Sequence, residues 1–339
     1  MTPRRLLIAG LLLSALALAL IAVAPVDALR AWLAAAFLWS GVPIGSLGFL
    51  MMIRLIGGRW GHSLLPFFEA GALTLPIAAV AMVPVLASMT LLYPWIGATI
   101  SGFKGAWLSP LPFVLRTLIL FVGLGLLLWA FVTRRGSAVA LSSAGLLFLA
   151  PMMSIVSIDW LVSLDIEFHS SGFGLYALSI QFTVALMAAI WMLLGRQPDR
   201  TETLGALLIT LILLWIYLAF TSYIIVWSGD LASIVGWYKA RGGGGWGVAI
   251  AIAAVIEALA FLIVLAPKVR HSARWLRVIA AAMILGKVVE SAWLVLPQGG
   301  AVRLVPVAFY ILAITGVGLV FLSAQRLLLA WRIAERLPA

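Results

Sequence analysis

Stretches of about 20 apolar residues recur along almost the whole chain, and they constrain its fold more than any other feature. A helix of this length crosses the hydrocarbon core of a bilayer. Because lipid offers no hydrogen bonds to the backbone, such stretches are expected to be helical, and the alternating pattern of a transmembrane barrel is absent. The pattern predicts an all-α polytopic membrane protein with about ten transmembrane helices, near residues 6–26, 31–53, 64–89, 111–132, 137–164, 172–194, 203–228, 245–266, 275–297 and 303–328.

Composition supports the same class and excludes several others. Of the 339 residues, 65% are hydrophobic and only 10% are charged, far fewer charges than a soluble domain of this size carries. The formal charge of +11 lies in short connections, which indicates membrane topology and contact with lipid headgroups rather than nucleic-acid binding. The absence of cysteine excludes disulfides, thiolate-held iron–sulfur clusters and covalently attached c-type haem.

The distribution of Lys and Arg predicts an orientation. With the N-terminus inside, 15 of the 22 basic residues lie on the cytoplasmic side, which favours two cytoplasmic termini and an even number of helices. Arg4 and Arg5 before the first apolar run also fit a signal peptide, but the run exceeds the usual apolar region of about 7–15 residues, so a retained helix is favoured. The cytoplasmic group comprises Arg4, Arg5, Arg54, Arg59, Arg134, Arg135, Arg196, Arg200, Lys268, Arg270, Arg274, Arg277, Arg326, Arg332 and Arg336.

The histidines do not form a redox-metal site in this topology. His62, His169 and His271 all fall at or outside the expected membrane faces, and no two share a helix face at mid-depth. Intramembrane haem is therefore not expected, and no cluster of zinc ligands or nucleophile motif occurs. We expect no metal site, no catalytic residue and no redox centre in this chain.

Ionisable side chains within the expected helices are the main functional candidates, because charge is costly in lipid. Lys287 and Glu290 are three residues apart, so they share a helix face and can pair. Carboxyl groups in a dry bundle suit proton transfer, whereas the alternative is that they only join helices by hydrogen bonds. The candidates for a proton path are Glu69, Asp159, Asp165, Glu257, Lys287 and Glu290.

Aromatic residues and glycines are interpreted more simply. Tyr217 and Tyr223 lie in one expected helix and are candidates to line a quinone or proton path. The glycines from Gly242 to Gly245 predict a flexible turn, because they lack the setting of a phosphate loop. Tryptophans near helix ends predict an aromatic belt at the membrane faces; they are Trp60, Trp95, Trp107, Trp160, Trp227, Trp237, Trp246 and Trp275.

Five sequence blocks occur in a distinctive order. They are Trp60 to Glu69, Lys104 to Arg116, the run Asp-Trp-Leu-Val-Ser-Leu-Asp at 159–165, Trp215 to Tyr223, and Glu290 to Pro297. The run at 159–165 is the most specific. In this order the blocks resemble the quinone-binding membrane subunit 2 of alternative complex III, a bacterial quinol:cytochrome c oxidoreductase, which is similar to the polysulfide reductase membrane subunit. The blocks are extended by Ser170, Phe173, Gly174, Tyr176, Trp227, Trp237, Tyr238 and Trp293.

The resemblance implies two four-helix bundles, at residues 31–165 and 166–298. A first helix at 1–30 and a last helix with a cytoplasmic tail at 299–339 would flank them. It also implies a bacterial inner membrane, partner subunits that carry iron–sulfur clusters and c-type haem, and a quinone that binds without covalent attachment. His169, Tyr217 and Tyr223 are the candidates for the quinone environment.

The sequence also departs from the family, which leaves two other functions open. Hydrophobic residues replace family arginines before Glu69, and Ser222 replaces a family glutamine. Such losses favour the alternative of a structural membrane anchor in a respiratory complex. A secondary transporter is the third hypothesis, although no repeat with matched broken helices is visible. The remaining departures are Leu65, Pro66, Ile166, Glu167, Ala232, Ser233 and Ile234.

Overall fold

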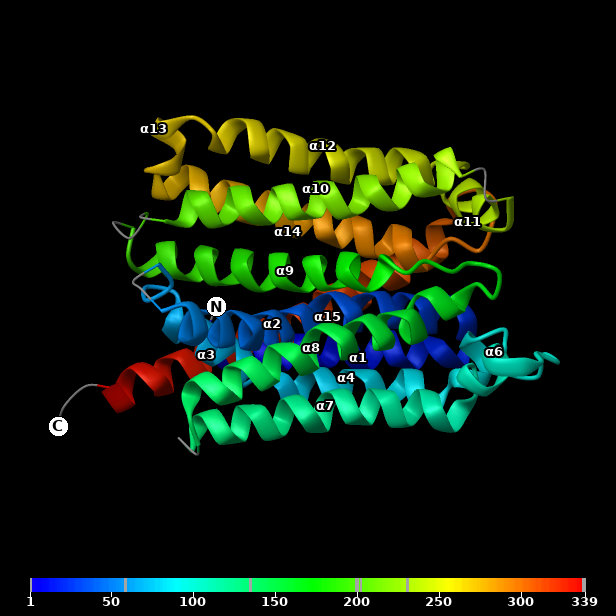
Figure 1. Cartoon of the computed structure of the whole chain (residues 1–339), viewed down its shortest axis with the longest axis horizontal. Coiled ribbons are helices and arrows are strands. Elements are labelled where there is room, and N and C mark those ends of the chain that lie inside the picture. Colours follow the sequence, from blue (N-terminus) through cyan, green and yellow to red (C-terminus); the bar gives the residue numbers. More distant parts are fainter. Residues whose placement is uncertain are drawn as a thin grey trace.

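The computed structural model describes residues 2–57, 60–133, 136–198, 201, 203–229 and 232–336, and its described part consists of helices without strands (Figure 1). Ten of the described helices are long and apolar enough to span a membrane, which confirms the all-α polytopic fold. Arg59, Arg134, Arg135 and Arg200, used above for orientation, lie outside the described residues. The spans are α1 (Pro3–Ala19) with a 3-10 turn (Leu20–Ala22), α2 (Pro25–Ile56), α3 (Leu65–Ala72) with α4 (Leu75–Ala87), α7 (Pro110–Val132), α8 (Ala138–Trp160) with a 3-10 turn (Val162–Leu164), α9 (Phe173–Arg196), α10 (Leu204–Ser228), α12 (Trp246–Val264), α14 (Ala273–Val295) and α15 (Leu304–Arg336).

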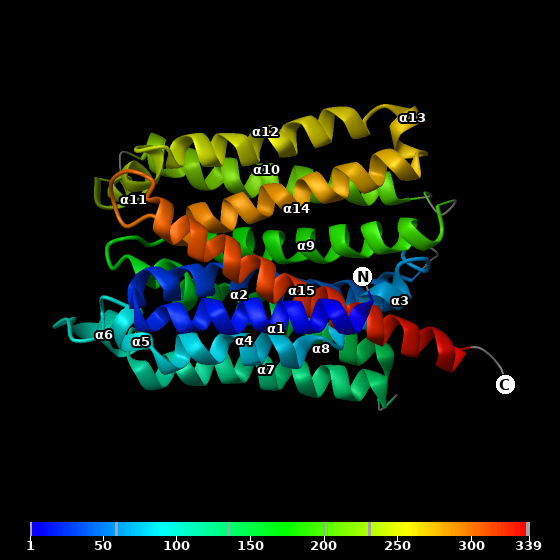
Figure 2. The same cartoon turned by 180° about the vertical axis from the view of Figure 1, so that it is seen from behind.

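The helices pack as two groups of four with one pair beside them. α9, α10, α12 and α14 form a ring in which each helix contacts the next. α2, α4, α7 and α8 form the second group, and α2 packs against α9 where the two groups meet. α1 and α15 pack on each other, and α15 also covers α2 (Figure 2). The residue boundaries of the four units stay a prediction.

Both ends of the described chain lie at the same end of the helices. The start of α1 and the end of α15 lie at one end, and α6 (Gly102–Trp107) and α11 (Ala232–Gly242) lie at the other (Figures 1 and 2). We call these the termini end and the loop end. This arrangement fits an even number of spans, and the assignment of the termini end to the cytoplasm stays a prediction.

Prolines explain where the predicted helix boundaries were wrong. α2 begins at Pro25, six residues earlier than predicted, because proline suits the first position of a helix. The predicted helix 64–89 is broken between α3 and α4, since Pro76 has no N–H to donate to the carbonyl of Ala72. Thr74 Oγ1 donates instead to the Gly71 carbonyl, at 2.6 Å. Besides α11, three short helices were not predicted: α5 (Met89–Leu92), α6 and α13 (Pro267–Arg270).

The long connection after α10 is more ordered than a simple loop. It contains α11, followed by a tight turn in which Gly244 and Gly245 have φ values of +57° and +95°. Gly244 also touches another segment, because a Cβ there would lie 2.5 Å from Ala301 Cα. The glycine run therefore forms the expected turn, while α11 itself was missed.

Several tryptophans assigned to the aromatic belt are buried in the protein. Trp160 is fully buried, and its Nε1 donates to Thr117 Oγ1 at 3.0 Å. Trp95, Trp237 and Trp246 are also buried, so for these four residues the belt interpretation was wrong. They lie near helix ends, as predicted, but they face inward because they pack against other helices or ring systems.

Glycine permits the close contact between α1 and α15, and this contact yields a prediction. A Cβ at Gly316 would lie 2.7 Å from Ser14 N, whereas a Cβ at Gly125 of α7 meets nothing within 4 Å. We expect Gly316→Leu to lower the free energy of unfolding by about 1–3 kcal/mol, as overpacked sites do. Gly125→Leu is the matched control, compared by unfolding in mixed micelles. Equal stability of the two variants would contradict this contact.

Candidate functional site

Three charged side chains meet in the interior of the α9–α10–α12–α14 ring. Lys287 Nζ of α14 lies 2.9 Å from Glu257 Oε1 of α12 and 2.9 Å from Glu290 Oε2 of its own helix. Lys287 and Glu290 are fully buried, and Glu257 is 1% exposed. We name these three residues the ion cluster. The predicted Lys287–Glu290 pair is present, and Glu257 joins it from a neighbouring helix.

Glu290 connects the ion cluster to two aromatic side chains. Its Oε1 accepts a hydrogen bond from Trp215 Nε1 of α10 at 2.8 Å and another from the Tyr176 hydroxyl of α9. The Lys287 ammonium lies 4.0 Å from the centre of the Trp215 ring, at a distance suited to a cation–π contact. Glu290 therefore forms an ion pair through Oε2 with Lys287, and its Oε1 accepts two hydrogen bonds.

The ion cluster contains one carboxyl group more than it has ammonium groups. With all three groups ionised it carries one net negative charge in a dry interior, and binding one proton would make it neutral. A buried charge without a counter-charge has a high desolvation cost. One bound proton would therefore neutralise the excess negative charge of two carboxylates and one ammonium. Such a coupled site is a place where a proton can be held and then released.

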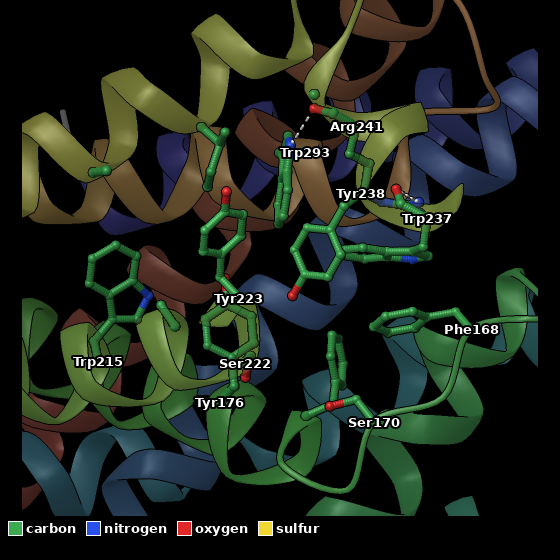
Figure 3. Close-up of a pocket in the computed structure, with 15 residues that line it drawn as sticks. Phe168, Ser170, Tyr176, Trp215, Ser222, Tyr223, Trp237, Tyr238, Arg241 and Trp293 are labelled. Carbon is green, nitrogen blue, oxygen red and sulfur yellow. Dashed lines mark hydrogen bonds between the residues drawn. The ribbon is translucent and has the colours of Figure 1, made fainter. Parts of the chain in front are cut away.

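An aromatic cavity of about 330 Å³ adjoins the ion cluster at the loop end (Figure 3). Tyr176 and Trp215 belong to its wall and also donate to Glu290, so the cavity and the carboxylate are separated by single side chains. Its volume is in the range of small-molecule sites. The lining comprises Phe168, Ser170, Phe173, Tyr176, Trp215, Ala219, Ser222, Tyr223, Trp237, Tyr238, Arg241, Gly242, Ile250, Ala254 and Trp293.

Helix α11 closes the cavity with polar groups. The Tyr238 hydroxyl points into the cavity (Figure 3), and burial raises the pKa of Tyr238 to about 12, so the phenol is a donor at neutral pH. Burial lowers the pKa of Arg241 to about 9, which still leaves the guanidinium charged at neutral pH. Arg241 is anchored above the Trp237 ring, 4.0 Å from its centre, and Trp293 Nε1 donates to the Arg241 carbonyl at 2.9 Å.

The cavity extends to Tyr223, which lies partly on the outer surface of the four-helix group α9, α10, α12 and α14. This residue lines the cavity and is 50% exposed, and its ring meets that of Tyr238 at 5.9 Å in an edge contact. Ala219 of α10 and Ala254 of α12 contribute small side chains to the wall between these helices.

A second cavity of about 620 Å³ lies next to the first, toward α6. Asp165 and His169 line it, and Phe168 and Ser170 line both cavities. Lys104 Nζ of α6 donates to the Ile166 carbonyl at 2.6 Å, which ties α6 to the segment after α8. Two of the predicted site residues, Asp165 and His169, thus lie together beside the aromatic cavity rather than in it.

The remaining predicted residues lie apart from the ion cluster. Asp159 of α8 pairs with Arg116 of α7 through two hydrogen bonds of 2.6 and 2.9 Å, an arrangement that suits a structural link between these helices. Glu69 lies in α3 at the termini end, with Arg332 Nε 3.8 Å away. Tyr217 is 65% exposed and does not line the aromatic cavity, so the structure does not bring it together with Tyr223 at this cavity.

Sequence reasoning gave no site role to Tyr176, Trp215, Tyr238 and Arg241. A signal existed for α11, because Ile234, Trp237, Tyr238 and Arg241 recur at helical spacing of three, four and seven residues. Tyr176 and Trp215 appeared only within the family blocks. Their role depends on which helices are neighbours, and a single sequence does not contain that information.

A comparison with models of known protein families finds no match to this chain, and a comparison with curated proteins finds none either.

Proposed function

We propose that this chain is the membrane subunit of a respiratory quinol:cytochrome c oxidoreductase of the alternative complex III type. In this proposal the aromatic cavity holds the ring of a quinol, and the ion cluster takes up a proton that the quinol releases. The electrons pass to iron–sulfur clusters and c-type haem on partner subunits in a bacterial inner membrane. Oxidation of one quinol to a quinone releases two protons and two electrons, so a proton acceptor beside the ring is required.

The observation that carries the proposal is the double role of Tyr176. Its ring belongs to the cavity wall, and its hydroxyl donates to Glu290. A hydroxyl in this position can pass its own proton to the carboxylate while it accepts one from a ligand in the cavity. Proton transfer requires hydrogen-bond contact of this kind along the whole route, directly or through one water.

The lining of the cavity supports a quinone ring as the occupant. Aromatic walls stack on a flat ring, and the Tyr238 hydroxyl is a donor for a ring oxygen. In this proposal an isoprenoid tail leaves the cavity beside Tyr223, which lines it and is 50% exposed, and reaches lipid between α10 and α12. A water-soluble metabolite would not need such a lateral route to lipid.

A substitution that fills the cavity tests quinone binding directly. We expect Ala219→Phe to weaken binding of a short-chain quinone by about tenfold or more. Ala219 lines the cavity, so the added phenyl ring would fill space that the quinone ring needs. Ala206→Phe is the matched control, since Ala206 is exposed on the same helix outside the cavity. Titration calorimetry with the detergent-purified chain measures both. Equal affinities for the two variants would contradict the proposed site.

The assignment to a complex has its own test. Affinity purification in mild detergent, with the tag on this chain, should co-purify partner subunits that show the visible spectrum of c-type haem. Quinone should be extractable from the same sample. A stable, colourless chain that purifies alone would contradict the complex. Gradient-driven uptake of a solute into vesicles that contain only this chain would favour a secondary transporter. Retained assembly and activity after neutralising each acid of the ion cluster would favour a structural anchor.

A further inference from the structure

An apolar cleft of about 410 Å³, which shares no lining residue with the aromatic cavity, lies between α14 and α15. These helices are close at the loop end and diverge toward the termini end (Figure 2). Ala281 and Ile284 of α14 form one wall, and Leu319 and Leu322 of α15 form the other. The floor includes Trp191 of α9.

The cleft is mainly apolar, and its polar lining side chains are Thr315 and Gln325 of α15. Trp39 of α2 also lines it, and its one polar atom, Nε1, donates to the Ile314 carbonyl at 2.8 Å. The indole therefore presents only its apolar surface to the cleft. Gly318 lets α15 pack onto this indole, because a Cβ there would lie 2.6 Å from Trp39 Cζ2.

Each wall continues toward the termini end into an arginine. Arg277 lies four residues before Ala281, and Arg326 lies four residues after Leu322, so each shares the helix face of the wall residues. The Arg277 guanidinium lies 5.4 Å from the centre of the Trp191 ring, and its Nε is buried without a hydrogen-bond partner. In the described part of the chain, no carboxylate forms an ion pair with either arginine.

We propose that this cleft binds an anionic phospholipid from the leaflet at the termini end. One acyl chain lies between α14 and α15, and the headgroup phosphate lies against Arg277 and Arg326. An apolar cleft beside a membrane span takes an acyl chain, and two arginines at its rim take the charge, as basic pockets between transmembrane helices do. An uncharged quinone would leave both arginines without a counter-charge. The site is independent of the function proposed above.

Counting bound lipid tests the proposal. The detergent-purified chain is titrated with phosphatidylglycerol or phosphatidylethanolamine, and bound lipids are counted by native mass spectrometry. We expect the first bound lipid to be phosphatidylglycerol, with a preference of about fivefold per arginine or about 25-fold in total. Arg277→Gln with Arg326→Gln should remove the preference, and each single variant should remove about half of it on a logarithmic scale. Ala281→Phe, which fills the cleft, should lower binding of both lipids.

Arg274→Gln is the matched control, because Arg274 is exposed on the same turn of α14 and is not part of the cleft wall. It should keep the full preference. An equal loss of preference in Arg274→Gln would overturn the proposal, since it would indicate a general surface effect. Equal binding of the two lipids by the unaltered chain, or displacement of bound phospholipid by a quinone, would overturn it as well. Unfolding profiles of all variants separate lost binding from lost folding.

Discussion

Replacing Lys287 with methionine should destabilise the protein more than any other single substitution at the ion cluster. The change removes the one ammonium group that, among the described residues, contacts Glu257 and Glu290, and it leaves two buried carboxylates without that counter-charge. Breaking a buried ion pair on one side costs about 3–5 kcal/mol, because the remaining charge stays desolvated. The free energy of unfolding, measured in mixed micelles by tryptophan fluorescence, should fall by that amount.

Two further variants make this expectation specific to charge. Lys268→Met removes an exposed lysine from α13 and should leave stability nearly unchanged. Combining Lys287→Met with Glu257→Gln and Glu290→Gln neutralises the whole ion cluster, and it should recover most of the lost stability, because well-packed neutral groups can replace a buried ion cluster. A triple variant as unstable as Lys287→Met alone would show that packing, not charge, sets the cost.

The ion cluster also shows how far the sequence predicts this site. Lys287 and Glu290 were predicted to pair because three residues of one helix bring side chains onto one face. That prediction needs only local geometry. Glu257 joins them from α12, about thirty residues earlier in the chain, and this contact depends on which helices are neighbours. The same limit hid Tyr176 and Trp215, which reach Glu290 from α9 and α10.

Tyr217 illustrates a different limit of the sequence, namely the direction in which each side chain of a helix points. Tyr217 and Tyr223 are six residues apart, and at 3.6 residues per turn they point about 120° away from each other. The structure places Tyr223 in the wall of the aromatic cavity and Tyr217 on the surface. The spans themselves were predictable because hydropathy acts locally, whereas the direction of each side chain depends on packing.

Replacing Glu290 with glutamine should slow quinol oxidation by about 100- to 10,000-fold, the usual contribution of a general base. Glutamine keeps the shape of the side chain, and its amide oxygen can still accept from Tyr176 and Trp215. Lys287 keeps Glu257 as its partner, so the ion cluster becomes a neutral pair and stability should change little. The variant therefore removes the proton acceptor while it preserves the walls of the cavity.

Glu257→Gln is the control that separates proton uptake from charge balance. It leaves the ion cluster with the same net charge as Glu290→Gln, but it keeps the carboxylate that touches Tyr176. Turnover is measured as quinol-dependent cytochrome c reduction by the complex purified through this chain, and quinone affinity is measured alongside. If Glu290 is the acceptor, turnover falls much further in Glu290→Gln than in Glu257→Gln at equal quinone affinity. An equal loss in both would mean that the charge of the ion cluster, rather than the position of Glu290, controls the rate. Full activity in both would remove the ion cluster from the proton route altogether.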